Sequence, residues 1–482
     1  MPLRRSYQLD RLYFLTILIT DFLIVGISIV LAVLIRFGSL DTPEAPPSAM
    51  MGTWVFLTLS QILAMMVENL YVVRTTVNRS MNIFRTIRMI VSISVIFIVV
   101  LFVTHFPTRV FLCSRLAVLT MIALWMGLTI ISRLLFIPGL FSFLVRRAGN
   151  IGIIVFGEER IAGRLRSSML RSPSCRSVLD VKVFAEPLPR DPKERLSACM
   201  EVMKRENAEE LMIVFEDEDF DEIAEFSLLT RRRGIPFVIF SKRIPELGYF
   251  DPWLSMYGYG AMVFSSREWT HLSGILWRAV DVAAALLGAI LFLPVILVTV
   301  PAIALTSSGS VLYMQKRVGQ DRKVFNFLKF RSMRTEVGER RTAHRKYFRQ
   351  YVNGSAASSD GNGGVFKTIS PRAVTPVGKI IRKTSIDELP QILNVMRGEM
   401  SIVGPRPCIG YELEFYDREW LQVRFTVKPG LTGIWQVYGR SRLSFEKSQF
   451  LDFVYVLSRT DGLNVKLILK TFPVMLFGKG GL

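Results

Sequence analysis

The sequence predicts a membrane protein of mixed α and α/β class: a four-helix transmembrane bundle, then an α/β domain, then a domain attached to the membrane by a broken helix. Four apolar runs near the N-terminus are each long enough to cross a bilayer. Residues 150–266 alternate strand-like with helix-compatible segments, as α/β domains do. A fifth apolar run contains prolines, which break helices. The expected domains are residues 1–148, 149–268 and 269–482.

Composition supports a chain of several domains that enters a membrane. A chain of 482 residues is longer than a domain with one ordinary hydrophobic core. Its hydrophobic content of 50% excludes disordered, fibrous and purely soluble classes of protein. A net charge of +20 favours anionic partners such as phospholipid headgroups, nucleic acid or phosphorylated substrates. The 4 cysteines lie far apart, so neither a disulfide framework nor a cysteine metal site is expected. The last of the 3 histidines is His344, so no residue after position 344 can serve as a histidine base or metal ligand.

The four N-terminal runs are expected to be membrane spans. They cover approximately residues 12–35, 53–73, 89–106 and 116–136. The first exceeds a signal-peptide apolar region and lacks a small-residue cleavage site, so it is interpreted as a retained anchor. Asp21 and Glu68 fall within the runs, where pairing between helices is the preferred interpretation over a role in transport.

Basic residues in the short loops predict the orientation. Arginine is concentrated before the first span, in the second loop and after the fourth span, at Arg4, Arg5, Arg11, Arg74, Arg79, Arg85, Arg88, Arg146 and Arg147. The first and third loops carry only Arg36, Arg109 and Arg115. Because basic loops stay in the cytoplasm, both ends of the bundle are expected there.

The fifth apolar run, 279–305, is interrupted by Pro294 and Pro301. Residues 306–350 contain twelve Lys and Arg against three Asp and Glu, and a full span would translocate this basic segment against the usual tendency. A re-entrant helix broken at Pro294 avoids the conflict, provided that neighbouring protein satisfies the backbone groups freed at the break. A kinked fifth span is the alternative.

The middle domain shows no convincing nucleotide site. Its expected strands are Ile151–Phe156, Val181–Phe184, Leu211–Phe215 and Pro236–Phe240. The segment from Gly157 to Gly163 lacks the Gly-x-Gly that lets backbone approach a pyrophosphate. The acidic run 216–222 is interpreted as a solvated loop and helix start. A structural, regulatory or oligomerising role is expected for this domain.

A pair of carboxylates stands out in the C-terminal domain. One apolar helix face is formed by Leu389, Ile392, Leu393 and Met396. Pro390 is tolerated only near a helix start, which places Asp387 and Glu388 at or beside the helix N-terminus, where a carboxylate or a phosphate is favoured. Helix capping is the simpler interpretation, because Ser385 and Glu388 match a capping box.

Neighbouring cations favour phosphate chemistry at this pair. Arg382 and Lys383 precede it and Arg406 follows, and a diphosphate needs several positive groups whereas a cap needs none. Mg²⁺ prefers oxygen ligands and bridges substrate phosphates, so two carboxylates and substrate make a sufficient site. A carboxylate can also attack phosphorus to give an acyl phosphate. The absence of a Walker A loop or kinase motifs counts against ATP as donor.

These motifs resemble a known family. RKTSIDELPQ at 382–391 and NVMRGEMSIVGPRP at 394–407 are similar to the signature of monotopic polyprenyl-phosphate sugar-1-phosphate transferases. KFRSM at 329–333 and PGLTG at 429–433 recur there in the same order. The motif resemblance covers roughly residues 270–482. With its four-span bundle and middle domain, the whole chain resembles the large, full-length members of this family. It implies a four-helix bundle, a degenerate Rossmann-like cytoplasmic domain, and a re-entrant helix with a mainly α catalytic domain.

The resemblance also implies a reaction: transfer of a hexose 1-phosphate from a UDP-hexose to undecaprenyl phosphate, with release of UMP, at the start of exopolysaccharide, capsule or O-antigen synthesis. Glucose and galactose are the favoured sugars. Asp387 would take the phosphosugar covalently, and Glu388 would position Mg²⁺ or assist the acceptor, both carboxylates being the implied metal ligands. Residues implied in substrate binding or support of the site are Arg382, Arg406, Lys329, Arg331, Arg317, Gln436 and Arg440. Pro294 would mark the re-entrant break.

The implied setting is the bacterial inner membrane, with the catalytic domain on the cytoplasmic face, a homodimer and no nucleic acid. Two alternatives are a non-enzymatic membrane scaffold and a transporter built on the four spans. Ser370 and Ile386 depart from the family pattern without removing a catalytic group. The Gly- and Ser-rich stretch 353–364 departs further and is interpreted as a flexible linker, with a mobile lid as the alternative.

Overall fold

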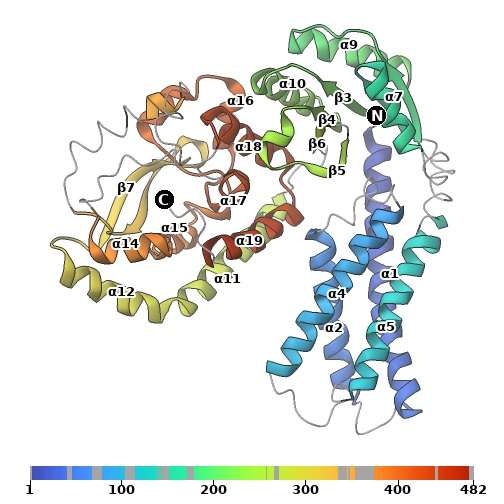
Figure 1. The fold of residues 1–482 in the computed structure, drawn as a ribbon, viewed down its shortest axis with the longest axis horizontal. Helices are drawn as coiled ribbons and strands as arrows, with labels where there is room; N and C mark the ends of the chain where they lie inside the picture. The colour runs from blue at the N-terminus through green and yellow to red at the C-terminus, as the bar shows by residue number, and fades with distance from the viewer. Residues whose placement is uncertain are drawn as a thin grey trace. The chain divides into compact units, whose positions relative to one another are not determined.

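The computed structural model covers most of the chain (Figure 1). The residues described are 3–40, 46–67, 79–103, 114–137, 139–140, 143, 151–170, 179–256, 258–264, 271–334, 345, 348–352, 374–439 and 443–476. Glu68, Arg440 and the predicted linker 353–364 lie outside them. The chain divides into two compact units, Met1–Pro187 with Cys199–Val214, and Leu188–Ala198 with Phe215–Leu482.

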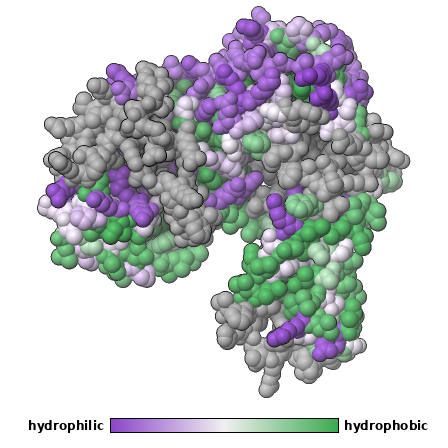
Figure 2. Space-filling model, viewed as in Figure 1, coloured by the Kyte–Doolittle hydropathy of each residue, from purple (hydrophilic) through white to green (hydrophobic). Residues whose placement is uncertain are grey.

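The N-terminal bundle is built from long apolar helices. They are α1 (Leu3–Phe37), α2 (Pro47–Val67), α4 (Arg79–Val103) and α5 (Arg115–Ile131), which the π-helical turn η2 (Ser132–Phe136) continues. Segments long and apolar enough to cross a membrane are Phe14–Phe37, Pro47–Met65 and Arg115–Phe136, which confirms the first, second and fourth predicted runs. The third run, 89–106, lies on α4 and continues beyond the described part of this helix. Apolar side chains cover the outside of the bundle (Figure 2), as lipid contact requires.

A buried ion pair joins α1 to η2. Arg133 donates from Nη2 to both carboxylate oxygens of Asp21, at 2.9 and 2.8 Å. The two side chains are 2% and 1% exposed. The structure therefore confirms the pairing role predicted for Asp21.

Arg133→Met is expected to destabilise the bundle, because it leaves the Asp21 carboxylate buried without its partner. An acidic side chain at the centre of a membrane helix costs about 2.5–3.5 kcal/mol. The double variant Asp21→Leu with Arg133→Met should recover most of this loss, since no buried charge remains. Thermal unfolding of the full chain in detergent measures both. A double variant as unstable as the single one would show that the loss has another source.

The middle region contains one mixed sheet in the order β2-β1-β3-β4-β6-β5. Parallel pairing joins β1 (Ile151–Phe156) to β2 (Leu179–Phe184) and to β3 (Glu210–Phe215), with Ile153 opposite Val181. Antiparallel pairing joins β6 (Tyr259–Phe264) to β4 (Phe237–Ser241) and to β5 (Asp251–Met256). The helical elements are α7 (Glu159–Met169), α9 (Pro192–Arg205), α10 (Phe220–Arg232) and η3 (Ile244–Leu247).

These elements confirm the α/β pattern and the four predicted strands, whereas β5 and β6 were not expected. Gly157 has a φ of 152°, and a Cβ there would lie 2.7 Å from Val214. Packing therefore explains this glycine without a bound pyrophosphate. The acidic run starts α10 as predicted, because Asp219 and Glu222 form a reciprocal capping box.

Two helices open the C-terminal region, α11 (His271–Leu291) and α12 (Leu293–Thr306). Pro294 lies in the first turn of α12, where its missing N–H would have no partner in any case. Figure 1 shows the chain bending between the helices, so the predicted break is present. The segment Gly274–Leu291 is long enough to cross a membrane, whereas α12 is shorter. By length alone, α11 fits a re-entrant or a spanning course.

Polar side chains on α11 form hydrogen bonds with the rest of this region. Arg278 donates to the carbonyl oxygens of Val395 and Met396 at 2.6 and 2.8 Å. Asp281 accepts from the Ser401 hydroxyl at 3.0 Å and from the Ile402 N–H at 2.9 Å. Exposed apolar side chains cover another face of α11 and α12 (Figure 2), including Leu276, Leu287, Ile290, Leu297, Val298 and Leu305.

Short sheets and helices complete the region. In an antiparallel sheet of order β10-β7-β8, the strands are β7 (Leu312–Val318), β8 (Val324–Phe330) and β10 (Cys408–Ile409). Parallel pairing joins β9 (Ser401–Val403) to β11 (Gly430–Thr432). The helical elements are η4 (Gln320–Arg322), α14 (Pro376–Lys383), η6 (Ile386–Glu388), α15 (Gln391–Arg397), η7 (Gly410–Phe415), α16 (Glu419–Gln422), η8 (Val423–Thr426), α17 (Ile434–Tyr438), α18 (Phe445–Ser458) and α19 (Asp461–Leu476).

Candidate active site

Asp387 and Glu388 lie on the short turn η6 between α14 and α15. Ser385 enters this turn with a left-handed φ of 56°, and α15 begins only at Gln391. Neither η6 nor α15 has a side-chain cap. The capping-box interpretation is therefore wrong, whereas the predicted position beside the helix N-terminus is confirmed, because Glu388 comes shortly before α15 begins. The two carboxylates are left without a capping role.

Apolar contacts fix this turn against β8 and α12. Leu389, Ile381, Phe330 and Ile303 form one buried cluster, and Ile386 packs against it. One side of the turn is therefore covered by apolar side chains, and its two carboxylates lie on the opposite side. The side chain of Asp387 is 13% exposed, whereas that of Glu388 is 45% exposed.

Lys329, on β8, lies between the two carboxylates. Its Nζ is 2.7 Å from Glu388 Oε1 and 3.9 Å from Asp387 Oδ2. Burial raises the pKa of Asp387, Lys329 opposes this rise, and the neighbouring Glu388 adds to it. Burial would also raise the pKa of Glu388, but Lys329, assisted by Arg406 and Arg317, lowers it below the usual value. Glu388 is thus held as a paired carboxylate, whereas Asp387 lies farther from the Lys329 ammonium.

Further cations surround the turn. Arg382, near the end of α14, donates to the sulfur of Met333 at 3.3 Å, and its charge acts to lower the pKa of Asp387. Arg317 donates from Nη1 to the carbonyl oxygen of Pro407 at 2.8 Å, and Arg424 donates to the carbonyl oxygen of Arg406. The loop that carries Arg406 is therefore clamped at two successive carbonyl groups.

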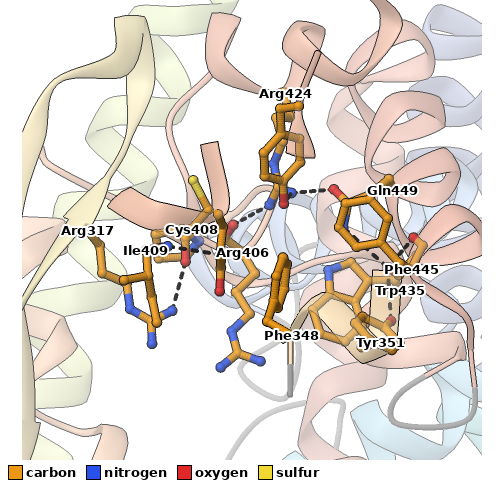
Figure 3. A pocket seen from close by; sticks show the side chains of 14 residues that line it. Arg317, Phe348, Tyr351, Arg406, Cys408, Ile409, Arg424, Trp435, Phe445 and Gln449 are labelled. Carbon is orange, nitrogen blue, oxygen red and sulfur yellow. Dashed lines mark hydrogen bonds between the residues drawn. The ribbon is translucent and has the colours of Figure 1, made fainter. Parts of the chain in front are cut away.

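A pocket adjoins this loop (Figure 3). Its lining residues are Arg317, Phe348, Tyr351, Arg406, Pro407, Cys408, Ile409, Glu412, Tyr416, Arg424, Trp435, Phe445, Ser448 and Gln449. Figure 3 shows the side chain of Arg406 extending between Arg317 and Phe348. Burial raises the pKa of the Cys408 thiol to about 12, so this cysteine is not a nucleophile.

Other predicted residues lie apart from the carboxylate turn or are used in packing. Arg331 donates to the carbonyl oxygens of Ser307 and Ser308 at 2.6 and 2.7 Å, directly after α12. Gln436 donates to the Leu431 carbonyl oxygen at 3.4 Å, within the segment from β11 to α17. Arg331 therefore holds the chain at the end of α12.

Arg331→Met is expected to lower stability with little effect on donor binding. It removes charge-assisted hydrogen bonds to the end of α12, each contributing about 1.5–3 kcal/mol. The melting temperature should fall, while the KM for the donor should change less than about 2-fold, because the guanidinium is committed to Ser307 and Ser308. Steady-state kinetics and thermal unfolding of the same preparation check this. A large KM increase at unchanged stability would place Arg331 at the substrate.

The carboxylate turn fits a magnesium ion shared with substrate. Its donors are oxygen atoms of two adjacent carboxylates, and Lys329 engages one oxygen of Glu388. Among the residues described, no group of three or more His, Cys, Asp or Glu forms a closed cage. Such an arrangement suits Mg²⁺, which usually keeps water and phosphate oxygens as its remaining ligands.

Sequence reasoning missed Arg424, Asp452 and Glu412. Arg424 lies 3.1 Å from Asp452 in a buried ion pair that also supports the Arg406 loop. Burial raises the pKa of Asp452 to about 7 despite this partner. No short motif joins these residues, so their pairing could not be seen in the sequence. The one available signal is that Glu412 follows shortly after the Pro-Arg-Pro segment.

Residues 272–478 match the model of the bacterial sugar transferase family. The exopolysaccharide production protein ExoY of Sinorhizobium fredii is 35% identical over 209 residues, which are 43% of this chain and 89% of ExoY. The galactosyl transferase CpsE of Streptococcus agalactiae is 34% identical over 224 residues, 46% of this chain and 47% of CpsE. The undecaprenyl-phosphate galactose phosphotransferase of Salmonella typhimurium is 37% identical over 168 residues, 35% of this chain and 34% of that enzyme.

The family match includes the carboxylate turn, the Arg406 loop and the whole pocket lining. ExoY is matched over nearly its whole length, whereas the other two relatives are matched over half of their length or less. From the matched motifs, the site that carries them and the coverage of ExoY, we conclude that this chain belongs to the bacterial sugar transferase family and is a transferase.

Proposed function

We propose that the protein transfers a hexose 1-phosphate from a UDP-hexose to undecaprenyl phosphate and releases UMP, which initiates synthesis of a bacterial polysaccharide. The observation that carries the proposal is the buried carboxylate of Asp387, 3.9 Å from the Lys329 ammonium and close to the charges of Arg382 and Arg406. A nucleophile surrounded by cations suits attack on a phosphoryl group, whose oxygens those cations would hold. The name of the Salmonella relative supports the lipid acceptor and a hexose.

The reaction consists of two displacements at one phosphorus. An ionised oxygen of Asp387 attacks the β-phosphorus of UDP-hexose, an oxygen–phosphorus bond forms, and the phosphoanhydride bond breaks so that UMP leaves with its electron pair. A phosphate oxygen of undecaprenyl phosphate then attacks the same phosphorus. The bond to Asp387 breaks, which restores the carboxylate and yields undecaprenyl-diphosphate-hexose.

The surrounding residues stabilise charge and hold the carboxylate turn in place during the reaction. Lys329, Arg382 and Arg406 stabilise charge on the phosphoryl oxygens, as positioned cations do in phosphoryl transfer. Glu388, held by Lys329, keeps the turn in place, and together with Asp387 it would hold Mg²⁺. That ion would supply positive charge that neutralises the substrate phosphates.

The helices α11 and α12 support the proposed membrane setting. Their exposed apolar face enters the cytoplasmic leaflet and returns at the break near Pro294, which keeps the basic residues that follow in the cytoplasm. The carboxylate turn then lies at the level of lipid phosphates. The proposed location is the bacterial inner membrane, and the proposed assembly is a homodimer. An extracytoplasmic signal from a reporter fused after Leu482 would contradict this topology.

The direct test is turnover by the full chain in lipid nanodiscs containing undecaprenyl phosphate. With Mg²⁺ and a panel of UDP-sugars, we expect UMP release with one or a few hexoses, and chelation with EDTA should abolish it. Folded protein that releases UMP with none of the donors would favour the scaffold alternative. Polysaccharide export by a chain lacking residues after 270 would favour the transporter alternative.

A further inference from the structure

Arg424 connects the Arg406 loop to two helices. It lies in η8, directly after α16, and its guanidinium pairs with Asp452 of α18 at 3.1 Å. The same guanidinium donates to Gln449 of α18 and to the carbonyl oxygen of Arg406. The position of the Arg406 loop therefore depends on how α16 and α18 are packed.

Helix α10 of the middle region packs against both of these helices (Figure 1). The ring centroid of Phe220, at the start of α10, lies 4.8 Å from that of Phe450 in α18. The centroid of the six-membered and five-membered ring system of Trp420, in α16, lies 6.4 Å from that of Phe450 and 5.7 Å from that of Phe453. All four side chains are buried, so α10 completes an aromatic cluster that three helices share.

Asp221 forms the polar edge of this cluster. Its Oδ1 accepts the indole N–H of Trp420 at 2.9 Å, and its carboxylate also pairs with Arg418. Capping does not explain this carboxylate, because Asp219 is the N-cap of α10 and bonds reciprocally with Glu222. Asp221 is thus available to hold Trp420, and with it α16.

Another contact lies further along the middle region. Glu246, in η3, accepts from the Lys447 ammonium of α18 at 2.6 Å, and the Tyr249 ring meets that of Tyr438, in α17, at 5.1 Å. Residues of α17 and α18 line the pocket beside the Arg406 loop, namely Trp435, Phe445, Ser448 and Gln449. The middle region therefore contacts three helices that hold or line the site, all within one compact unit.

We propose that α10 is a positioning element of the reaction: Phe220 and Asp221 hold α16 and α18 in the arrangement in which Arg424 keeps the Arg406 guanidinium at the substrate phosphates. The inference rests on the proposed function, because Arg406 is one of the cations of that reaction. It gives the middle region a part in catalysis, and it makes Asp221 a positioning residue that touches no substrate.

The first test is amide hydrogen exchange of the full chain in nanodiscs, which does not depend on activity. Asp221→Leu removes the acceptor for Trp420 and should accelerate exchange at residues 404–409 by about 5-fold or more. Trp420→Phe removes the donor instead and should have the same effect, so one variant suffices if the other does not fold. Asp221→Asn keeps an acceptor oxygen and should stay within about 2-fold of the wild-type rate.

Arg418→Ala is the matched control. It breaks an exposed ion pair of the same carboxylate and leaves the bond between Asp221 and Trp420 in place. An exposed pair contributes little, so exchange in the Arg406 loop and UMP release should both stay within about 2-fold of the wild-type values. An effect as large as that of Asp221→Leu would attribute the change to surface charge and overturn the role of the Trp420 bond.

Kinetics test whether the effect reaches the reaction through Arg406. Asp221→Leu should lower kcat/KM for the UDP-hexose by about 5-fold in the wild-type background. In the Arg406→Lys background, where the side chain to be positioned is already altered, the same change should cost less than about 2-fold. A merely structural loss would reduce kcat/KM by the same factor in both backgrounds, because a smaller folded fraction affects each variant alike.

The outcomes separate this inference from the proposed function. Unchanged exchange at residues 404–409 in folded Asp221→Leu and Trp420→Phe, or an equal loss of kcat/KM in both backgrounds, would overturn the positioning role of α10. UMP release by the wild-type protein would then still support the proposed function. Faster exchange in the loop of the variants, together with no UMP release from folded wild-type protein, would support the connection from α10 to the loop and overturn the proposed function.

Discussion

Asp387→Asn is expected to slow UMP release by on the order of 10³-fold or more, because an amide cannot replace the carboxylate that attacks phosphorus. The variant should nevertheless fold. Asp387 caps no helix, and its distance to Lys329 Nζ is 3.9 Å. Since burial raises the pKa of Asp387, its ionised form costs stability at neutral pH, and a neutral side chain removes that cost. The melting temperature should equal or exceed that of the wild-type protein.

A covalent intermediate provides the control for this prediction. Without undecaprenyl phosphate, wild-type protein incubated with the donor should gain the mass of one phosphohexose on the peptide that contains Asp387. Glu388→Gln should retain a detectable adduct, because its nucleophile is intact, whereas Asp387→Asn should have none. Equal UMP release from wild type and Asp387→Asn would remove Asp387 from the mechanism.

Arg424→Met is expected to destabilise the catalytic region by about 3–5 kcal/mol at neutral pH, the usual loss when one partner of a buried ion pair is removed. The side chains of Arg424 and Asp452 are 6% and 2% exposed, so water cannot replace the partner. Arg424 also donates to the carbonyl oxygen of Arg406, to Gln449 and to Tyr416. The loss should therefore affect the Arg406 loop as well as the fold.

The pH dependence identifies the cause of this loss. The pKa of Asp452 is raised to about 7 in the folded protein, and removal of Arg424 should raise it further. A group whose folded pKa exceeds its unfolded value loses stability as pH rises from the unfolded towards the folded value. The deficit of Arg424→Met should thus grow as the pH rises above about 7, where the Asp452 carboxyl is ionised in the wild-type protein and still protonated in the variant. Thermal unfolding at several pH values measures this.

Two further variants test whether the unpaired charge of Asp452 causes the loss of stability. Arg424→Met combined with Asp452→Leu leaves no buried charge and should be more stable than Arg424→Met alone. Arg418→Ala breaks an exposed pair with Asp221 and should cost less than about 1 kcal/mol. A deficit in Arg424→Met that does not vary with pH would contradict the role assigned to Asp452.

The sequence predicted the features that depend on composition and local pattern. Apolar length located the membrane helices, and strand-like runs located β1 to β4. Proline chemistry located the break before α12, because proline is compatible only with the first turn of a helix. The strand β5 was not expected, because its pairing with β6 depends on tertiary contacts that its short, proline-containing sequence does not reveal.

The candidate site, like the fold, could be predicted from the sequence only where local motifs carry it. Motifs brought Asp387, Glu388, Lys329 and Arg382 to attention, and the structure gathers them around one turn. The capping box considered for Ser385 and Glu388 is absent, because the left-handed backbone of Ser385 is a feature that side-chain patterns do not encode. The remaining partners arise from pairs distant in sequence, which appear only when the chain is folded.

The most direct test of the account is the fate of the donor phosphate. Full-length protein in nanodiscs would receive undecaprenyl phosphate, Mg²⁺ and a UDP-hexose labelled with ³²P at the β-phosphate, and products would be separated into lipid and aqueous fractions. The account predicts label in the lipid with one equivalent of UMP in water. Transfer of the sugar accompanied by labelled UDP in water would contradict it, because the phosphate would then have remained with the nucleotide.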